Sequence, residues 1–281
     1  MSPQIWKTTR FDLDLSERPL VMGIVNVTPD SFSDGGQHND PGKAIDFCER
    51  LLGEGVDILD LGAESTRPGA PKVSAKEEWL RLEPVLRAAL SLGVPVSVDT
   101  SKTEVMQRAL DLGVDIINDV MALRDAGAEE LLASHVAAGI CLMHMRGDPA
   151  TMQQQTGYID VVAEVRDFLQ VRLDRLIGLG VAPERITLDP GYGFAKTVEQ
   201  NIELQRRQRE LLDMGRPLLV GWSRKSTLGA LTGRAVDERQ SASVGAALAT
   251  VALGARVVRV HDVAATVDAL KVWEAFTRST G

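Results

Sequence analysis

The feature that most constrains the fold of this chain is an alternation that runs through almost its whole length. Short runs rich in Val, Ile and Leu, each ending in polar residues, alternate with longer amphipathic segments. This alternation is typical of parallel strands joined by crossover helices. Eight such runs occur, at residues 20–28, 57–63, 95–101, 115–120, 140–145, 186–191, 217–223 and 257–262.

Helical patterns such as EEWLRLEPVLRAALSLG and VVAEVRDFLQVRLDRLIGLG fill the intervals, and several end in glycine, as helices often do. Eight strand–helix pairs in about 260 residues match the size of a (β/α)8 barrel. A doubly wound sheet would also alternate, but no G-x-G-x-x-G follows an early strand. We therefore predict the α/β class, with a single (β/α)8 TIM barrel at residues 20–281. Residues 1–19 are predicted to be an N-terminal extension that closes the barrel.

Charge and composition indicate a small-molecule partner. The chain has 31 basic and 39 acidic residues, a net charge of −8 and only 4% aromatic residues. It therefore lacks the basic, aromatic-rich surface of nucleic-acid-binding proteins. No apolar run approaches the roughly 18 residues of a membrane span, and the first twenty residues do not resemble a secretory signal. We expect a cytoplasmic protein in which Cys48 and Cys141 are buried, reduced thiols.

The predicted strands end in polar residues that should meet at one end of the barrel. In a (β/α)8 barrel the active site is built where the strands end and the βα loops begin. A single carboxylate in such a place can simply cap the next helix. Polar ends on nearly every strand favour a binding site, because burying so many side chains is costly without a ligand. These residues are Asn26, Glu64, Asp99, Asn118, His144, Asp189, Ser223, Arg224, Lys225, Arg259, His261 and Asp262.

Two of the βα connections are unusually long. NVTPDSFSDGG opens the first, at residues 26–39, and GAESTRPGAPKVSAKEE forms the second, at residues 62–78. Their Pro, Gly, Ser and Asp residues disfavour regular structure, and both exceed the usual length of a βα loop. We predict two adjacent flaps that close over one pocket.

Seven short motifs give the chain a resemblance to a known family. In chain order they are NVTPDSFSDGG, ESTRPGA, VDTSK, IND, LDPGYGF, SRKS and RVHDV, and each falls at a predicted strand end. Together they resemble the dihydropteroate synthase family of pterin-binding enzymes, over nearly the whole chain. The departures from the family pattern are Ala63, Tyr192, Ala195 and Trp222, none of which removes a polar group of the motifs.

The resemblance implies a transferase of folate biosynthesis. The amine of 4-aminobenzoate would displace pyrophosphate from 6-hydroxymethyl-7,8-dihydropterin diphosphate to give 7,8-dihydropteroate, by an SN1-like route without a covalent enzyme intermediate. It also implies Mg²⁺ as a cofactor, sulfonamides as competitors of 4-aminobenzoate, and a homodimer. The helix pattern ASVGAALATVALGA, rich in small residues, fits either a dimer contact or tight packing on the barrel.

The resemblance assigns the pterin to six residues. Asp189 would accept two hydrogen bonds from the pyrimidine edge, and Asn118 suits the adjoining ring nitrogens. Asp99 would accept from the second ring, and Lys225 would donate to the carbonyl oxygen and N5. Apolar walls would come from Val120 and Met143, for which an ordinary core role fits nearly as well.

The leaving group and the second substrate need other residues. Arg259 and His261 are two apart on one strand, so both can face inward and bind pyrophosphate. By resemblance, Asn26 and Thr66 complete this site, with Mg²⁺ held near Asn26 mainly by phosphate and water oxygens. The residues implied for 4-aminobenzoate are Phe32, Thr66, Arg67, Pro68 and Ser223, and those implied for catalysis are Asp34, Arg67, Lys225, Arg259 and His261.

Two other functions share parts of this pattern. A methyltransferase that moves a methyl group from methyltetrahydrofolate to a corrinoid protein would also bind a pterin, but it would not need SRKS or the R-x-H pair. A non-catalytic pterin-binding paralogue would not need the full set of candidate catalytic residues. Both remain alternatives to the synthase.

Overall fold

Eight parallel strands form the centre of the molecule. The computed structural model describes residues 4–28, 41–66 and 70–277. The strands run in the order β8-β7-β6-β5-β4-β3-β10-β9, and a parallel bridge between Leu188 and Leu218 closes the ring between β8 and β9. Their bounds are β3 Leu20–Asn26, β4 Ile58–Gly62, β5 Val96–Asp99, β6 Ile116–Asp119, β7 Gly139–Met143, β8 Ile186–Asp189, β9 Leu219–Val220 and β10 Val257–Val260. The predicted (β/α)8 barrel is confirmed.

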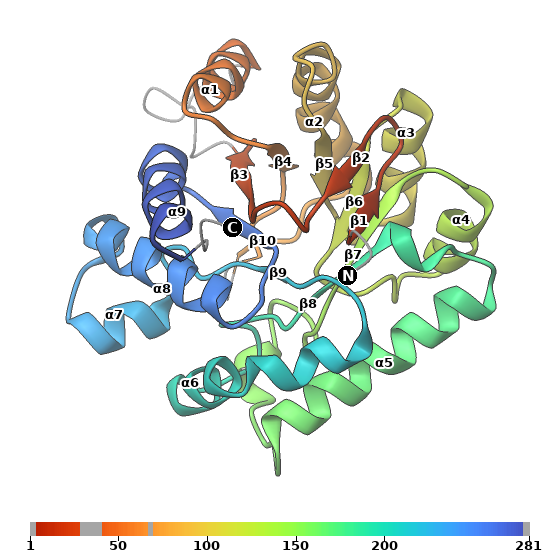
Figure 1. Cartoon of the computed structure of the whole chain (residues 1–281). Helices are drawn as coiled ribbons and strands as arrows, with labels where there is room; N and C mark the ends of the chain where they lie inside the picture. The colour runs from red at the N-terminus through yellow and green to blue at the C-terminus, as the bar shows by residue number, and fades with distance from the viewer. Residues whose placement is uncertain (1–3, 29–40, 67–69, 278–281) are drawn as a thin grey trace.

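Helices surround this ring of strands (Figure 1). They are α1 Pro41–Gly53, α2 Ala75–Ala89, α3 Thr103–Leu112, α4 Ala128–Ser134, α5 Val161–Gly178, α6 Val198–Arg206, α7 Ser226–Thr232, α8 Gln240–Ala252 and α9 Val263–Thr277. Short 3-10 helices lie at η1 Met152–Gln154, η2 Pro183–Arg185, η3 Gln208–Met214 and η4 Val236–Glu238.

Local sequence signals set several helix ends. The Asp160 carboxylate accepts from the Val162 and Ala163 amides and starts α5, and Thr197 and Gln200 form a capping box on α6. Gly113 ends α3 in a left-handed conformation with φ 93°. Within the described residues, no helix is long and apolar enough to cross a membrane.

The strands are buried on both sides. Their outward residues pack under the helices in one large apolar cluster, and a second cluster fills the barrel at the amino-terminal ends of the strands. Cys48 and Cys141 belong to these two clusters and are buried free thiols, as predicted. Burying apolar side chains on both faces is the main stabilising contribution expected of a parallel sheet.

An N-terminal hairpin lies against the second apolar cluster. Its strands β1 Ile5–Lys7 and β2 Asp12–Asp14 pair antiparallel and form a separate small sheet. Trp6 is fully buried, and its indole nitrogen donates to the Arg185 carbonyl oxygen at 2.9 Å. We call this amino-terminal end of the barrel the floor and the carboxyl-terminal end of its strands the mouth.

The predicted strands extend further than the hydrogen-bonded ladders. The widest difference is at the seventh run, predicted at 217–223, where β9 contains only Leu219 and Val220. The chain then turns, with Arg224 in a left-handed conformation at φ 60°. Some of the polar residues therefore close the paired strands, such as Asn26, Asp99 and Asp189, whereas others, such as Ser223 and Lys225, lie in the loops of the mouth.

Candidate active site

A buried ion-pair network lies inside the mouth of the barrel. The Arg259 side chain, from β10, donates from Nε to Asp60 at 2.6 Å and from Nη2 to Asp99 at 2.7 Å. Asp60 is fully buried and also accepts from the Ser97 hydroxyl at 2.6 Å and, at 3.4 Å, from the Asn118 amide. One cation thus joins carboxylates from β4 and β5 across the inside of the sheet.

Asp99 is the carboxylate of this network that ligand binding would affect most. Burial raises its pKa to about 7; the Arg259 guanidinium opposes the shift and the Asp60 carboxylate adds to it. Near neutral pH its charge is therefore poorly stabilised in the free protein. A hydrogen-bond donor on a ligand would favour the ionised form.

A second polar group is built on the turn after β8. The Gly191 amide donates to Asp189 Oδ1 at 2.7 Å, and Lys225 donates from Nζ to the Tyr192 carbonyl oxygen at 2.7 Å. The Lys225 ammonium also lies 3.9 Å from the centre of the Phe194 ring. Burial raises the pKa of Asp189 and lowers that of Lys225 to about 7. An acceptor and a donor of altered pKa therefore share this side of the mouth.

Apolar side chains form a separate patch near the carboxyl-terminal ends of β6 and β7. Val120 and Met143 are buried in a small cluster with Met145, Met152 and Ala195, separate from the main core. Sulfur-containing side chains of this kind adapt to flat aromatic faces. The position at the mouth supports the predicted apolar wall for both residues.

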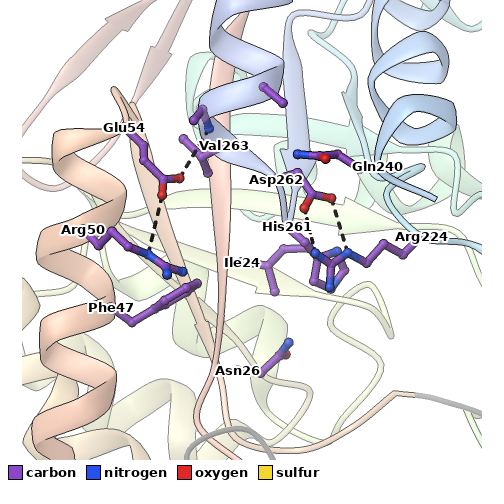
Figure 2. Close-up of a pocket in the computed structure, with 12 residues that line it drawn as sticks. Ile24, Asn26, Phe47, Arg50, Glu54, Arg224, Gln240, His261, Asp262 and Val263 are labelled. Atoms are coloured by element: carbon purple, nitrogen blue, oxygen red, sulfur yellow. Dashed lines mark hydrogen bonds and ion pairs between the residues drawn. The ribbon is translucent and has the colours of Figure 1, made fainter. Parts of the chain in front are cut away.

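A pocket of about 390 Å³ opens beside the end of β3. Figure 2 shows Asn26, Arg224, His261 and Asp262 around it, with the Arg224–Asp262 ion pair at 2.7 Å on one side. His261 Nδ1 lies 3.0 Å from the Ser223 hydroxyl, which also accepts from the His261 amide. The amino-terminal end of α9 adds Val263 and Ala264 to the lining, and the Ala264 amide donates to Glu54 at 3.3 Å, so basic and acidic side chains share this pocket.

A second pocket, of about 320 Å³, lies over the ends of β4, β5 and β6. Thr66, Asp99 and Val120 are among its lining residues. Lys102 donates to Glu64 and to the fully buried Glu78, both at 2.5 Å, and so ties the start of the β4–α2 connection to helix α2. This pocket joins residues predicted for the pterin to Thr66, predicted for 4-aminobenzoate and pyrophosphate.

Asn26 offers an oxygen ligand for the predicted magnesium ion. In the described part of the chain, no group of three or more His, Cys, Asp or Glu side chains could hold a metal ion. The Asn26 amide lines the 390 Å³ pocket together with His261, where a diphosphate would supply further oxygens. This donor set fits Mg²⁺ only as an ion carried largely by substrate and water, which is how Mg²⁺ is commonly bound beside phosphates.

The structure brings most of the predicted site residues to the mouth. Arg259 and His261 have different neighbours, however: Arg259 contacts Asp60 and Asp99 inside the barrel, whereas His261 faces the outer pocket. Arg259 Nε and Nη2 already donate to Asp60 and Asp99. A phosphate contact from Arg259 therefore has to use Nη1 or displace a carboxylate. Four predicted residues, Phe32, Asp34, Arg67 and Pro68, lie outside the described residues, and their roles stay predictions.

Two of the departures from the family pattern lie against each other. The rings of Tyr192 and Trp222 stack with centroids 4.4 Å apart and an angle of 27° between planes. The Trp222 indole donates to Gln205 at 2.7 Å, and the Tyr192 hydroxyl donates to Gln208 at 3.1 Å. The two aromatic residues therefore form one packed unit behind the site.

Sequence reasoning missed Asp60, the centre of the ion-pair network. Its signal was present, because Asp60 interrupts the apolar run DILDLGA in the middle of a strand rather than at its end. A carboxylate there has to be buried and paired, since it cannot reach solvent. Lys196 was also missed; it follows the motif LDPGYGF and is 4% exposed.

Comparison with known proteins agrees with this fold. The chain matches the family described as "Pterin binding enzyme" over residues 22–261. It is 56% identical over 281 residues to the dihydropteroate synthase of Neisseria meningitidis serogroup B, with 98% of each chain covered. The chain belongs to the dihydropteroate synthase family of pterin-binding enzymes.

Solved structures of the same family superpose closely. A Xanthomonas albilineans dihydropteroate synthase with 4-aminobenzoic acid has a TM-score of 0.93 and 44% identity, covering 99% of this chain and 100% of that one. The Burkholderia cenocepacia enzyme complexed with 7,8-dihydropteroate has a TM-score of 0.87 and 46% identity, covering 98% of this chain and 96% of that one.

Proposed function

We propose that this protein is a dihydropteroate synthase. It would join 4-aminobenzoate to 6-hydroxymethyl-7,8-dihydropterin diphosphate, releasing pyrophosphate and 7,8-dihydropteroate. The observation that carries the proposal is the convergence at the mouth of Asp99, Asn118, Asp189 and Lys225, beside an apolar wall and a pocket with basic groups. The relatives with bound 4-aminobenzoic acid and 7,8-dihydropteroate support the same substrates.

The pterin would lie between the carboxylates and the apolar patch. Asp189 accepts from the amino edge of the ring, and Asn118 pairs with the adjoining nitrogens. Asp99 accepts from the second ring, while Lys225 donates to the carbonyl oxygen and N5. The two acidic acceptors are largely desolvated already, so the ligand replaces few water contacts when it binds.

The diphosphate would reach toward the 390 Å³ pocket. His261 and the Asn26 amide face this space, and Thr66 and Arg259 are the other predicted phosphate ligands. Asn26 would hold Mg²⁺ together with phosphate and water oxygens, and the ion would supply positive charge near the leaving group. Donors that surround a departing anion lower the barrier most when they are fixed in advance.

The reaction replaces one carbon–oxygen bond with one carbon–nitrogen bond. The C–O bond to the diphosphate breaks and pyrophosphate leaves with the electron pair, which gives a cation delocalised over the dihydropterin ring. The amine of 4-aminobenzoate then donates its lone pair to the methylene carbon and loses a proton to solvent. Ser223 and Thr66, with the predicted residues Phe32, Arg67 and Pro68, would position that amine, and Asp34 would stabilise the cation.

One assay tests the proposed function directly. The purified protein is given pterin diphosphate and Mg²⁺, and pyrophosphate release is measured with and without 4-aminobenzoate. Release that depends on the arylamine supports the synthase. Pterin binding without release would instead support a non-catalytic paralogue, and methyl transfer from methyltetrahydrofolate to a corrinoid protein would support the methyltransferase.

We further propose a homodimer in the cytoplasm, where the water-soluble substrates would be available. Support for the dimer comes from exposed apolar side chains on helices α7 and α9, which both pack against α8: Leu231 is 60% exposed, Val272 52% and Phe276 84%. Large apolar side chains exposed on the surface are often found at protein interfaces. Light scattering should give twice the mass of the 30.4 kDa chain, and a monomer at that mass would exclude the dimer.

A further inference from the structure

A buried lysine lies directly behind the proposed pterin site. Lys196 is 4% exposed, and its Nζ lies 3.0 Å from His144 Nδ1, 2.9 Å from the Gly191 carbonyl oxygen and 3.0 Å from the Phe194 carbonyl oxygen. None of these three partners is a carboxylate. Burying an amine in this way costs free energy, so the hydrogen bonds of Lys196 should stabilise the residues around it.

Each partner of Lys196 contacts Asp189 or Lys225, two residues proposed to bind the pterin. The Gly191 amide donates to Asp189 Oδ1 at 2.7 Å, and the His144 amide donates to the Asp189 carbonyl oxygen at 2.9 Å. The Phe194 ring lies 3.9 Å from Lys225 Nζ. Lys196 therefore contacts the residues that hold both the acceptor and the donor of the proposed site.

The turn that carries these groups is conformationally demanding. Gly191 has φ 69°, and a Cβ added there would lie 2.0 Å from the His144 carbonyl oxygen. Ala195 also has a positive φ, 51°, which an L residue adopts at a cost. A turn with unfavourable backbone angles keeps its shape only when neighbouring contacts fix it. The amine of Lys196 supplies two such contacts, to Gly191 and Phe194.

We propose that Lys196, supported by His144, is a positioning residue for pterin recognition. It fixes the turn at residues 190–195, so that Asp189 and Lys225 are already placed when the pterin arrives. The inference rests on the proposed function, since it concerns the same site. Its distinctive consequence is a selective loss of pterin affinity, because Lys196 contacts the turn and not the 4-aminobenzoate side.

Arg185 provides a matched control on the other side of strand β8. It lies just before β8, at the floor, and is 4% exposed like Lys196. It too donates to two backbone carbonyl oxygens, of Ala138 at 2.7 Å and of Leu132 at 3.1 Å. Lys196→Met and Arg185→Met therefore remove similar buried contacts, one in the loop after β8 and one just before that strand.

The experiment measures the Kd of pterin diphosphate by calorimetry without 4-aminobenzoate, together with the melting temperature of each variant. We expect Lys196→Met to raise this Kd by about tenfold, the order of the net contribution of one hydrogen bond. Arg185→Met should lower the melting temperature comparably but leave the Kd within about twofold. Equal changes in Kd for both variants, or no change for Lys196→Met, would overturn the proposal.

A milder pair of variants covers the case in which Lys196→Met does not fold. His144→Leu removes one acceptor from Lys196, whereas His144→Asn offers a side-chain oxygen close to the position of Nδ1. The leucine variant should weaken pterin diphosphate binding several-fold, and the asparagine variant should recover most of it. Similar Kd values for the two variants would contradict the positioning role.

The same measurements separate this inference from the proposed function. Calorimetric binding needs no turnover, so a wild-type protein that binds pterin diphosphate but releases no pyrophosphate refutes the synthase and still tests Lys196. In an active enzyme, the KM for 4-aminobenzoate at saturating pterin diphosphate should be unchanged in Lys196→Met. A rise in that KM equal to the rise for pterin diphosphate would indicate general disorder of the site and overturn the selective role.

Discussion

The two ends of the barrel both bury charged side chains, but they satisfy them differently. At the floor, fully buried Asp115 accepts from the backbone amides of Arg10 and Val96 and from the Arg10 guanidinium, at 2.6 to 3.2 Å. At the mouth, Asp60 and Asp99 share one arginine, and burial moves the pKa values of Asp99 and Lys225 to about 7.

This difference separates structural charges from charges that are available to a ligand. The floor carboxylate has its acceptor sites filled by the protein itself, so it fixes the hairpin to the barrel. The mouth groups are desolvated but incompletely paired, and altered pKa values of this kind are characteristic of functional sites. A ligand with matching donors and acceptors gains the most free energy where the protein leaves its own polar groups least satisfied.

Neutralising Asp189 should have the largest effect on function. Asp189→Asn keeps the shape but loses two charge-assisted hydrogen bonds, each about 1.5–3 kcal/mol, so kcat/KM for pterin diphosphate should fall about 100-fold or more. The matched floor variant, Asp115→Asn, should lower stability while the kcat/KM of the folded protein stays near that of the wild type. Steady-state kinetics distinguish the two; comparable kinetic losses would abolish the distinction between the two ends.

Removing Asp60 should be the most damaging change to stability at the mouth. Asp60→Leu leaves the buried Arg259 with only one carboxylate, and breaking a buried ion pair costs about 3–5 kcal/mol of unfolding free energy. Urea denaturation measures the loss. Because Asp60 holds Arg259 and Asn118, pterin affinity should fall as well, and a stable Asp60→Leu variant with normal affinity would show that this network has no role in the site.

The pKa of Lys225 predicts how pterin binding depends on pH. Its pKa is lowered to about 7 by burial, so the ammonium is lost as pH rises above this value. If Lys225 donates to the pterin carbonyl, its contribution to affinity should fall several-fold from roughly pH 6 to roughly pH 9. Asp99, whose pKa is also about 7, should add a dependence of the opposite sign to every variant that keeps it. Calorimetry at several pH values therefore compares the wild type with Lys225→Met, and an identical pH slope in the two proteins would show that Lys225 makes no such contribution.

The lowered pKa of Lys225 has the opposite effect on stability: the unfolding free energy should rise with pH where its contribution to pterin affinity falls. Between about pH 7 and the ordinary lysine pKa of 10.5, the unfolded chain binds more protons at this residue than the folded protein does. The contribution of Lys225 to the unfolding free energy therefore rises with pH across that window. Binding and stability should thus change in opposite directions above neutral pH.

The smallest effect is expected at the floor. Trp6→Phe removes the indole hydrogen bond to the Arg185 carbonyl oxygen and should cost about 1 kcal/mol of unfolding free energy. Thermal or urea denaturation gives the value. Turnover per folded molecule should not change, since Trp6 contacts the hairpin and floor cluster, and reduced turnover would show that the two ends are coupled.

The sequence predicted the barrel because apolar strands and amphipathic helices have distinct periods that recur eight times. It also placed Asn26, Asp99, Asn118, Asp189 and His261 at strand ends, where parallel topology brings them together. It could not show that Asp99 and Arg259 bind each other, because that contact joins residues 160 positions apart. Partner choice inside the mouth depends on side-chain reach across the barrel, which local patterns do not encode.

The most direct test is a crystal structure with 6-hydroxymethyl-7,8-dihydropterin diphosphate bound. We predict the amino edge of the ring within hydrogen-bond distance of Asp189 and Asn118, and the diphosphate in the pocket lined by Asn26 and His261. A pterin ring bound outside the mouth, or a diphosphate pointing away from His261, would contradict the account.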